Sequence, residues 1–300
     1  RVTVDGANFD NVTGTTTVSV ATANGAITTL ATGGAVSTGA DNAINLSATA
    51  GNLVLGGTVT TSGSGTISLS TTTSGNIEVN AAVSTGAASS VNLTSAGTIT
   101  DANGDDTTTD ITTGGLTITS ATSVGDTADD ALNISATTLT ITATTGDVFI
   151  TEANGIGLGT VNTAANALNI RTITGNITDS TSNVTAGNLT LTATDTDAAV
   201  GANGSEIAVT LSGTLTASAS DGAGGVFISE TGAMSIASVA AGTGAVELTS
   251  DAAIDEAVDD GADKITTSGA LVLTAGTSIG TTGGGNEALD TSATDVTLIV

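Results

Sequence analysis

The chain has 300 residues, of which three are basic and 29 are acidic, so its formal net charge is −26. It contains no His, Cys, Pro, Trp or Tyr. This composition excludes Ser-His-Asp and Cys-His catalysis, disulfide bonds and the usual zinc sites. Three basic residues are too few for a phosphate-binding track, so we expect no nucleic-acid partner. No apolar run is long enough for a membrane-spanning helix, so we expect no transmembrane segment.

High net charge with few aromatic residues is typical of disordered chains. Here, however, charged residues make up only 11% of the sequence and the mean hydropathy is +0.33. Val, Ile, Leu and Thr also recur in alternating strings, which is typical of β-strands. We therefore predict an ordered, all-β protein.

Short strand-like strings follow one another from residue 44 onward. Their first aliphatic residues are Ile44, Ile67, Val91, Leu116 and Leu139, and each follows the one before at a nearly constant interval. Alternation within each string places aliphatic side chains on one face and Thr, Asn or Ser on the other. The interval, roughly 20–25 residues, is the length of one turn of a β-solenoid, so these strings predict stacked turns around a narrow aliphatic core.

A longer repeat, with a period of about 77–78 residues, overlies this spacing. The strings Val148-Phe-Ile-Thr-Glu152 and Val226-Phe-Ile-Ser-Glu230 are one such period apart, and so are Leu168 and Val246. The positions Ile99, Ile177 and Ile254 follow at the same period. These anchors predict one continuous solenoid segment of a longer chain, with a local core plug at Phe149 and Phe227. Its long repeats are 1–98 (diverged), 99–176, 177–253 and 254–300 (partial).

The alternative architecture is a row of Ig-like β-sandwiches, one for each long repeat. Such domains usually carry a core Trp or Tyr and Pro-containing loops, and this chain has none of these residues. The absence of Pro also suits a backbone in which nearly every N–H pairs with a neighbouring turn. We therefore predict a parallel β-solenoid with turns of roughly 20–25 residues, and the residues alone leave the handedness of its coil open.

Two acidic loops occupy the same place in successive long repeats. Carboxylate and amide oxygens at alternate positions can converge on one Ca²⁺ ion, which takes six to eight oxygen ligands. The simpler interpretation is a solvated corner loop, since the first loop lacks the Gly and the closing Glu of an EF-hand. The candidate calcium ligands are Asp101, Asn103, Asp105, Asp106 and Asp110 in the first loop, and Asp255, Glu256, Asp259, Asp260 and Asp263 in the second.

The string Gly187-Asn-Leu-Thr-Leu-Thr-Ala193 and its relatives, together with the composition, resemble filamentous haemagglutinin-like proteins. These are large, secreted bacterial surface proteins, typically built as right-handed parallel β-helices, so the resemblance implies a right-handed β-helix for this chain. The resemblance covers roughly residues 44 to 300. It implies an extracellular adhesin stalk or filament at the bacterial cell surface, with further repeats of the same chain as neighbours and self-association into filaments as an option. It supplies no functional residues.

Two other functions remain open at this stage. The first is a calcium-dependent subunit of an S-layer, sheath or fibre, in which the acidic loops bridge neighbouring molecules. The second, more remote, is a polysaccharide-active enzyme built on a β-helix. General acid–base catalysis needs two carboxyls at a set separation, one with a pKa raised by burial. The acidic residues here lie in polar loops, so we expect a structural, non-catalytic protein.

Overall fold

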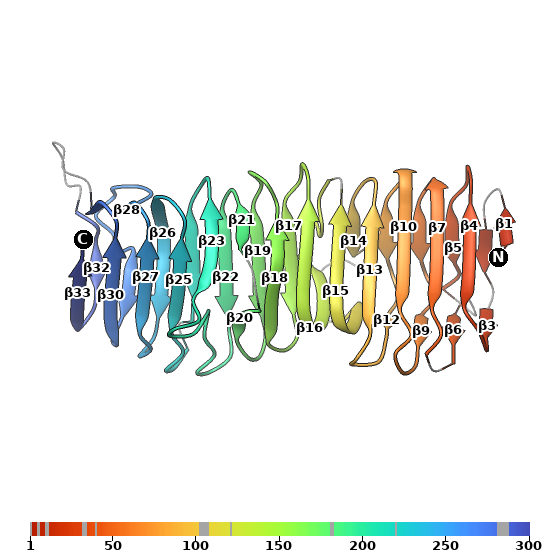
Figure 1. Ribbon diagram of the computed structural model, residues 1–300, viewed down its shortest axis with the longest axis horizontal. Coiled ribbons are helices and arrows are strands. Elements are labelled where there is room, and N and C mark those ends of the chain that lie inside the picture. Colours follow the sequence, from red (N-terminus) through yellow and green to blue (C-terminus); the bar gives the residue numbers. More distant parts are fainter. Residues whose placement is uncertain are drawn as a thin grey trace. The chain divides into compact units, whose positions relative to one another are not determined.

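The computed structural model describes residues 2–4, 7–9, 12–31, 35–39, 41–101, 108–120, 122–180, 183–219, 221–280 and 288–300. The described residues form strands, turns and bends but no helix, so none of them forms a membrane-spanning helix. The chain divides into unit 1, Arg1–Ala153, and unit 2, Asn154–Val300. In each unit, parallel strands are stacked as a β-solenoid (Figure 1), as the alternating strings predict.

The first ladder of unit 1 contains the longest strands, whose arrows lie side by side in Figure 1. Neighbouring strands pair in parallel, each with the strand one turn further along the chain. The ladder consists of β1 (Val2–Val4), β4 (Val18–Thr22), β7 (Ile44–Ala50), β10 (Ile67–Ser74), β13 (Ser90–Ser95), β15 (Ile111–Ser120) and β16 (Leu132–Ala143).

Two further ladders complete the turns of unit 1. One consists of β2 (Ala7–Phe9), β5 (Ile27–Thr29), β8 (Leu53–Leu55), β11 (Ile77–Val79) and β14 (Ile99–Asp101), and parallel bridges extend it through Val124 to β17 (Val148–Glu152). The other consists of β3 (Val12–Gly14), β6 (Val36–Thr38), β9 (Val59–Thr61), β12 (Val83–Ser84), the first halves of β15 and β16, and the end of β17.

The core of unit 1 is built from aliphatic rows that run through these ladders. Ile44, Ile67, Val91, Leu116 and Leu139 lie in one register, and each is at most 1% exposed. The next residue of each strand points outward and is at least partly exposed. The predicted interval between strings is thus confirmed as one turn of the solenoid. Full burial of each aliphatic side chain contributes about 1.5–3 kcal/mol.

Asn and Asp side chains at the corners join successive turns. The Asn52 Oδ1 atom accepts a hydrogen bond from the Asn76 backbone N–H at 3.0 Å, and Asn76 Oδ1 accepts one from the Thr98 N–H at 3.0 Å. Asn188 Oδ1 plays the same part for the Thr214 N–H in unit 2, at 2.9 Å. At a corner the backbone leaves the ladder, so a side-chain oxygen supplies an acceptor that the backbone does not.

Unit 2 begins with three similar ladders. The first links β18 (Ile156–Asn162) to β20 (Ile177–Asp179) and, through bridges at Val200, to β25 (Val226–Glu230). The second links the end of β18 to β21 (Val184–Ala186), β23 (Ile207–Leu211) and the end of β25. The third consists of β19 (Leu168–Thr172), β22 (Leu189–Ala193), β24 (Leu215–Ser218) and β26 (Met234–Ala241).

The ladders of unit 2 are rearranged at β25 and β26. Strand β25 pairs with the last members of both the first and the second ladder, so these two ladders join in one strand. Strand β26 ends the third ladder, and its two halves pair with two different strands of the next turn. From there, β25 continues through β27 (Val246–Ser250), β30 (Ala270–Ala275) and β33 (Asp295–Ile299). The halves of β26 continue into β28 (Ala253–Glu256) and β31 (Ser278–Ile279), and into β29 (Ile265–Thr267) and β32 (Thr291–Ser292).

Strand β17 of unit 1 also receives two ladders, since Val148 bridges to Val124 while Ile150 pairs with Leu132. Strands β17 and β25 carry the two matching Val-Phe-Ile strings of the long repeat. The long repeat therefore marks the recurrence of a strand that joins two ladders, superimposed on the repeat of single turns.

Candidate functional site

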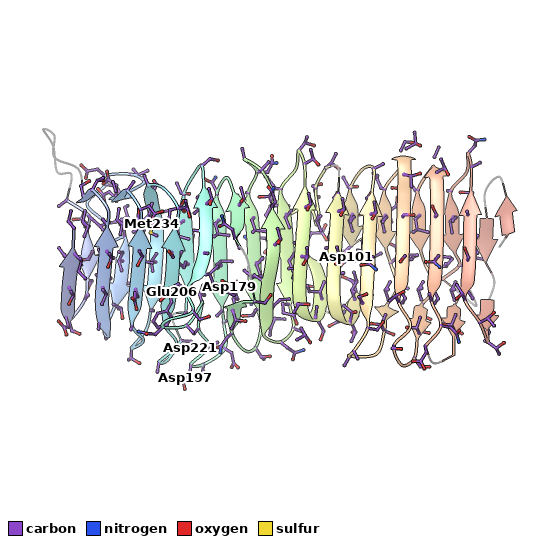
Figure 2. All side chains as sticks on the ribbon, viewed as in Figure 1. Asp101, Asp179, Asp197, Glu206, Asp221 and Met234 are labelled. Carbon is purple, nitrogen blue, oxygen red and sulfur yellow. The ribbon has the colours of Figure 1, made fainter. Side chains whose placement is uncertain are left out.

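The structure describes only the ends of the first acidic loop. Asp101 and Asp110 are 4% and 2% exposed, and Asp101 lies among the strands of unit 1 (Figure 2). The Asp110 Oδ2 atom accepts a hydrogen bond from the Asn133 N–H at 3.0 Å, so this carboxylate holds the next turn in place. The predicted ligands Asn103, Asp105 and Asp106 lie outside the described residues. The calcium prediction for this loop stays a prediction.

The second acidic loop contains a positively charged side chain, that of Lys264. The Lys264 side chain is 8% exposed, and its Nζ atom donates a hydrogen bond to Asp260 Oδ1 at 2.5 Å. This hydrogen bond lowers the pKa of Asp260 and raises the pKa of Lys264. The Asp260 Oδ1 atom also accepts the Ala262 backbone N–H at 3.0 Å. One predicted calcium ligand is thus already paired with an ammonium group.

Glu256 is the least solvated carboxylate of this loop. Both of its carboxylate oxygens are buried, and neither has a hydrogen-bond partner among the described residues. Burial raises the pKa of Glu256, and the nearby charges of Asp259 and Asp290 raise it further, while Lys264 opposes the shift. The structure therefore brings Glu256, Asp260 and Asp290 close to Lys264, and Asp259 close to Glu256. Asp290 was not among the predicted ligands. Of the remaining two, Asp255 accepts the Glu256 N–H at 3.0 Å, and Asp263 is exposed.

A third acidic corner lies in unit 2, where Figure 2 shows Asp197 and Asp221 in loops at one edge. The Asp197 backbone N–H donates to the Asp221 carbonyl at 2.7 Å, and Asp197 Oδ1 accepts the Ala223 N–H at 2.6 Å. Asp197 has a positive φ of 63°, which Asp tolerates better than most residues. At other corners an Asn side-chain oxygen accepts a backbone N–H of the next turn in the same way. The Asp197 carboxylate therefore acts as a hydrogen-bond acceptor for the backbone.

The most deeply buried carboxyls lie at the ends of the two ladder-joining strands. Glu152 and Glu230 are 0% and 1% exposed. The Glu152 Oε2 atom accepts a hydrogen bond from the Ala136 N–H at 2.9 Å, and Glu230 Oε1 accepts one from the Leu211 N–H at 3.0 Å. Two carboxyls at equivalent places in the long repeat therefore bind the backbone in the same way.

The backbone explains why a carboxyl is needed there. The residue after each glutamate still donates to the preceding turn: Ala153 N–H to the Ile134 carbonyl at 2.8 Å, and Thr231 N–H to the Val209 carbonyl at 2.9 Å. In a parallel ladder the next acceptor would be the carbonyl of Ala153 or Thr231. The strand ends there, and the glutamate oxygen takes over as the acceptor.

In the part of the chain that the structure describes, no cation accompanies the buried carboxyl of Glu230, and its Oε2 atom has no hydrogen-bond partner. Burial raises the pKa of Glu230 to about 7, an effect that the hydrogen bond from Leu211 only partly offsets. A buried carboxyl without a cation favours its neutral form, because ionisation would place an unpaired charge in the core.

The alternation of inward and outward residues along these strands already indicates that the two glutamates face inward, which the predictions above did not include. In the string Val-Phe-Ile-Ser-Glu, the Glu has the same parity as Val226 and Ile228, so it must face inward. By the same rule the predicted core plug is wrong, because Phe149 and Phe227 have the opposite parity and are half-buried on the outer side. A Cβ atom on Gly225 would collide with the Phe227 ring, so the absence of a side chain there makes room for the ring.

Among the described residues, no group of three or more His, Cys, Asp or Glu side chains is arranged to hold a metal ion. No protein-family model, no curated protein and no solved structure matches this chain.

Proposed function

We propose that this chain is a structural, non-catalytic segment of a secreted bacterial surface protein, serving as an adhesin stalk or an extracellular filament. The observation that carries this proposal is the repeated parallel pairing of strands over fully buried aliphatic rows in each unit. Such a structure resists stretching, since each turn is hydrogen-bonded along its length to its neighbours. The location at the bacterial cell surface is supported only by the resemblance to haemagglutinin-like repeats.

Glu230 and Glu256 are the two carboxyl groups whose pKa values are raised, and their surroundings favour a structural role over a role in hydrolysis. Glu230 is enclosed in the core and bonded to the backbone, so a substrate would not reach it. Glu256 lies beside Lys264, and its oxygens are buried. A glycosidase needs a pair of carboxyls that face one substrate-accessible space. Each of these carboxyls instead accompanies a strand end or a turn.

Mechanical stretching of the purified chain tests this proposal. With the chain held by its two ends in an optical trap, we expect the turns to detach one by one or in small groups. One turn of about 23 residues would release about 80 Å of extended chain. Extension without measurable resistance at room temperature would overturn the proposal.

A pair of neighbouring substitutions provides the control. Leu93→Asp places a charge in the buried row of β13, whereas Asn92→Asp adds the same charge on its outer face. We expect Leu93→Asp to lower the unfolding force of unit 1, and Asn92→Asp to leave it unchanged. The surface location is tested separately, with antibodies against the chain applied to intact cells of the source organism. Labelling that requires permeabilised cells would contradict that part.

A further inference from the structure

The outer surface of the first ladder of unit 1 carries no charged side chain on its outward rows. Strands β4, β7, β10, β13, β15 and β16 lie side by side (Figure 1), and their outward residues are in register from strand to strand. One row runs from Ser19 in β4 to Thr140 in β16, and the other, two residues further along each strand, from Ala21 to Thr142. Apart from Ala21, every member is Ser, Thr or Asn and is at least partly exposed. We call these two rows the neutral face.

The polar side chains of the neutral face keep their hydrogen-bonding groups available. None of them is hydrogen-bonded to another residue in the part of the chain that the structure describes. Polar side chains elsewhere in unit 1 are partly engaged: Ser37 Oγ donates to Thr13 Oγ1 at 3.4 Å, and Asn52 Nδ2 donates to Glu78 Oε1 at 2.8 Å. Because a hydroxyl both donates and accepts, a surface of hydroxyls can hydrogen-bond to an identical surface.

We propose that the neutral face of unit 1 binds the neutral face of a second copy of this chain, so that two copies pack side by side as a dimer. The same surface serves both partners, which makes the contact isologous and closes it at two copies. Hydroxyl, amide and methyl groups meet across it, and no charged group has to leave water.

Charge selects this face over the rest of unit 1. In a chain with a net charge of −26, most ways of bringing two copies together place carboxylates opposite one another. The second ladder carries Glu78 on its outward row, and the loop between β15 and β16 carries Asp126, Asp129 and Asp130. Protein interfaces are distinguished by depletion of charged residues at their centre rather than by unusual hydrophobicity. The neutral face meets that description.

The neutral face is also large enough for a dimer. At ~4.8 Å per strand, the ladder from β4 to β16 is about 29 Å wide, and the two rows cover about 17 Å of each strand. Two copies would therefore bury roughly 1,000 Å² in total, the lower end of specific interfaces. Short Ser and Thr side chains lose little rotamer entropy on a surface already held by its ladder. We expect a dissociation constant in the micromolar range.

This inference goes beyond the proposed function and can fail without it. Its first test is sedimentation of the full chain from about 1 to 100 μM, at low salt and in about 0.5 M salt. We expect dimers and no larger species, with tighter association at high salt because the repulsion between two acidic chains is screened. A chain that stays monomeric, that grows beyond the dimer or that associates only with added Ca²⁺ would overturn the inference. The resistance of single molecules to stretching would be unaffected.

Two isosteric substitutions locate the contact. Asn45→Asp adds a charge to the neutral face without changing its shape, and we expect it to weaken association about tenfold or more, because each copy brings the same charge to the contact. Asn169→Asp makes the same change on the outer side of β19 in unit 2, and we expect association to be unchanged. Equal effects of the two substitutions, with melting temperatures as in the wild type, would contradict the proposal.

A mixing experiment tests whether the face binds itself. Ser68 lies in β10, near the middle of the neutral face. We expect the Ser68→Asp and Ser68→Lys variants each to dimerise more weakly than the wild type, and an equal mixture of the two to recover dimers, because opposite charges then meet across the contact. A mixture that dimerises no better than the separate variants would show that the face meets a different surface, and would overturn the inference.

Discussion

Strand β13 of unit 1 and strand β25 of unit 2 fill the same kind of interior in two ways. Both place two aliphatic side chains inward, Val91 and Leu93 in β13 and Val226 and Ile228 in β25. The third inward residue is Ser95 in one strand and Glu230 in the other.

The two polar residues hydrogen-bond to the backbone in different ways. The Ser95 Oγ atom donates a hydrogen bond to the Thr98 carbonyl at 2.9 Å, a carbonyl that also accepts the Ile77 N–H at 3.0 Å, so the hydroxyl adds a second hydrogen bond at this turn. Glu230 accepts from the Leu211 N–H, where the end of β25 leaves a donor unpaired. The comparison teaches that a hydroxyl at a strand end reinforces a turn whose carbonyl is already paired, whereas a carboxyl supplies an acceptor to a backbone N–H that the ladder leaves without one. A glutamate appears where two ladders join in one strand.

The aliphatic rows should be equivalent in the two strands. Leu93→Ala and Ile228→Ala each remove a fully buried side chain, and we expect each to lower the free energy of unfolding by about 2–5 kcal/mol. Urea unfolding followed by circular dichroism measures the loss. A cost at Ile228 much below that at Leu93 would show that the rearranged core around β25 is packed less tightly, and would break the comparison.

Glu230 should make the stability of unit 2 depend on pH, unlike Ser95 in unit 1. Its pKa is about 7 in the folded chain, against an ordinary value of 4.5. Because the folded state holds the proton more tightly, the contribution of Glu230 is fully present below pH 4.5 and is lost as the pH rises to about 7. The slope is at most about 1.4 kcal/mol per pH unit.

Two variants separate the charge of Glu230 from its hydrogen bond. Glu230→Gln keeps an acceptor for the Leu211 N–H and cannot ionise, so we expect it to abolish this pH dependence and to exceed the wild type in stability at pH 8. Glu230→Ala leaves that N–H without an acceptor, and we expect a loss of about 1–3 kcal/mol at pH 5. A Gln variant with the same pH profile as the wild type would show that another group is responsible.

Ser95→Ala should have a smaller effect. It removes a hydroxyl that donates to the Thr98 carbonyl and accepts the Gly97 N–H, but little volume and no charge, so we expect a cost of about 0.5–1.5 kcal/mol with no dependence on pH between 5 and 8. Urea unfolding at both pH values measures this. A cost as large as that of Glu230→Ala would indicate that the hydroxyl, too, replaces a ladder acceptor.

The sequence predicted the regular part of the fold because that part follows from local rules. The alternation of Ile67 and Leu69 with serines, and the return of this pattern after one turn, determine which residues stack. The Glu at the end of Val226-Phe-Ile-Ser-Glu230 follows the same parity rule. Its inward position could have been predicted, whereas its backbone partner could not, because Leu211 lies in the preceding turn.

The acidic loop around Lys264 was predicted only in part, for a related reason. Asp255 to Asp263 are close in sequence, so their grouping was visible. The contribution of Asp290 depends on the next turn of unit 2, where the Lys264 N–H donates to the Asp290 carbonyl at 2.8 Å. The Lys264 side chain is itself buried in the folded chain. The number of charged residues in the sequence cannot reveal this burial, because a lone Lys in an acidic chain is usually solvated.

The smallest expected effect concerns this lysine. Lys264→Gln removes the ammonium group beside Asp260 and leaves Glu256 and its neighbours mutually repulsive. We expect a lower melting temperature at low salt, partly recovered at high salt because repulsion between the carboxylates is screened. We also expect Ca²⁺ to raise the melting temperature of the variant more than that of the wild type, because the ion would occupy the place of the lost cation. Arg171→Gln, on the exposed side of β19, removes the same charge and should change neither response. If Ca²⁺ stabilises the wild type as much as the variant, the loop binds calcium with Lys264 in place, and the calcium-dependent assembly subunit becomes the better proposal.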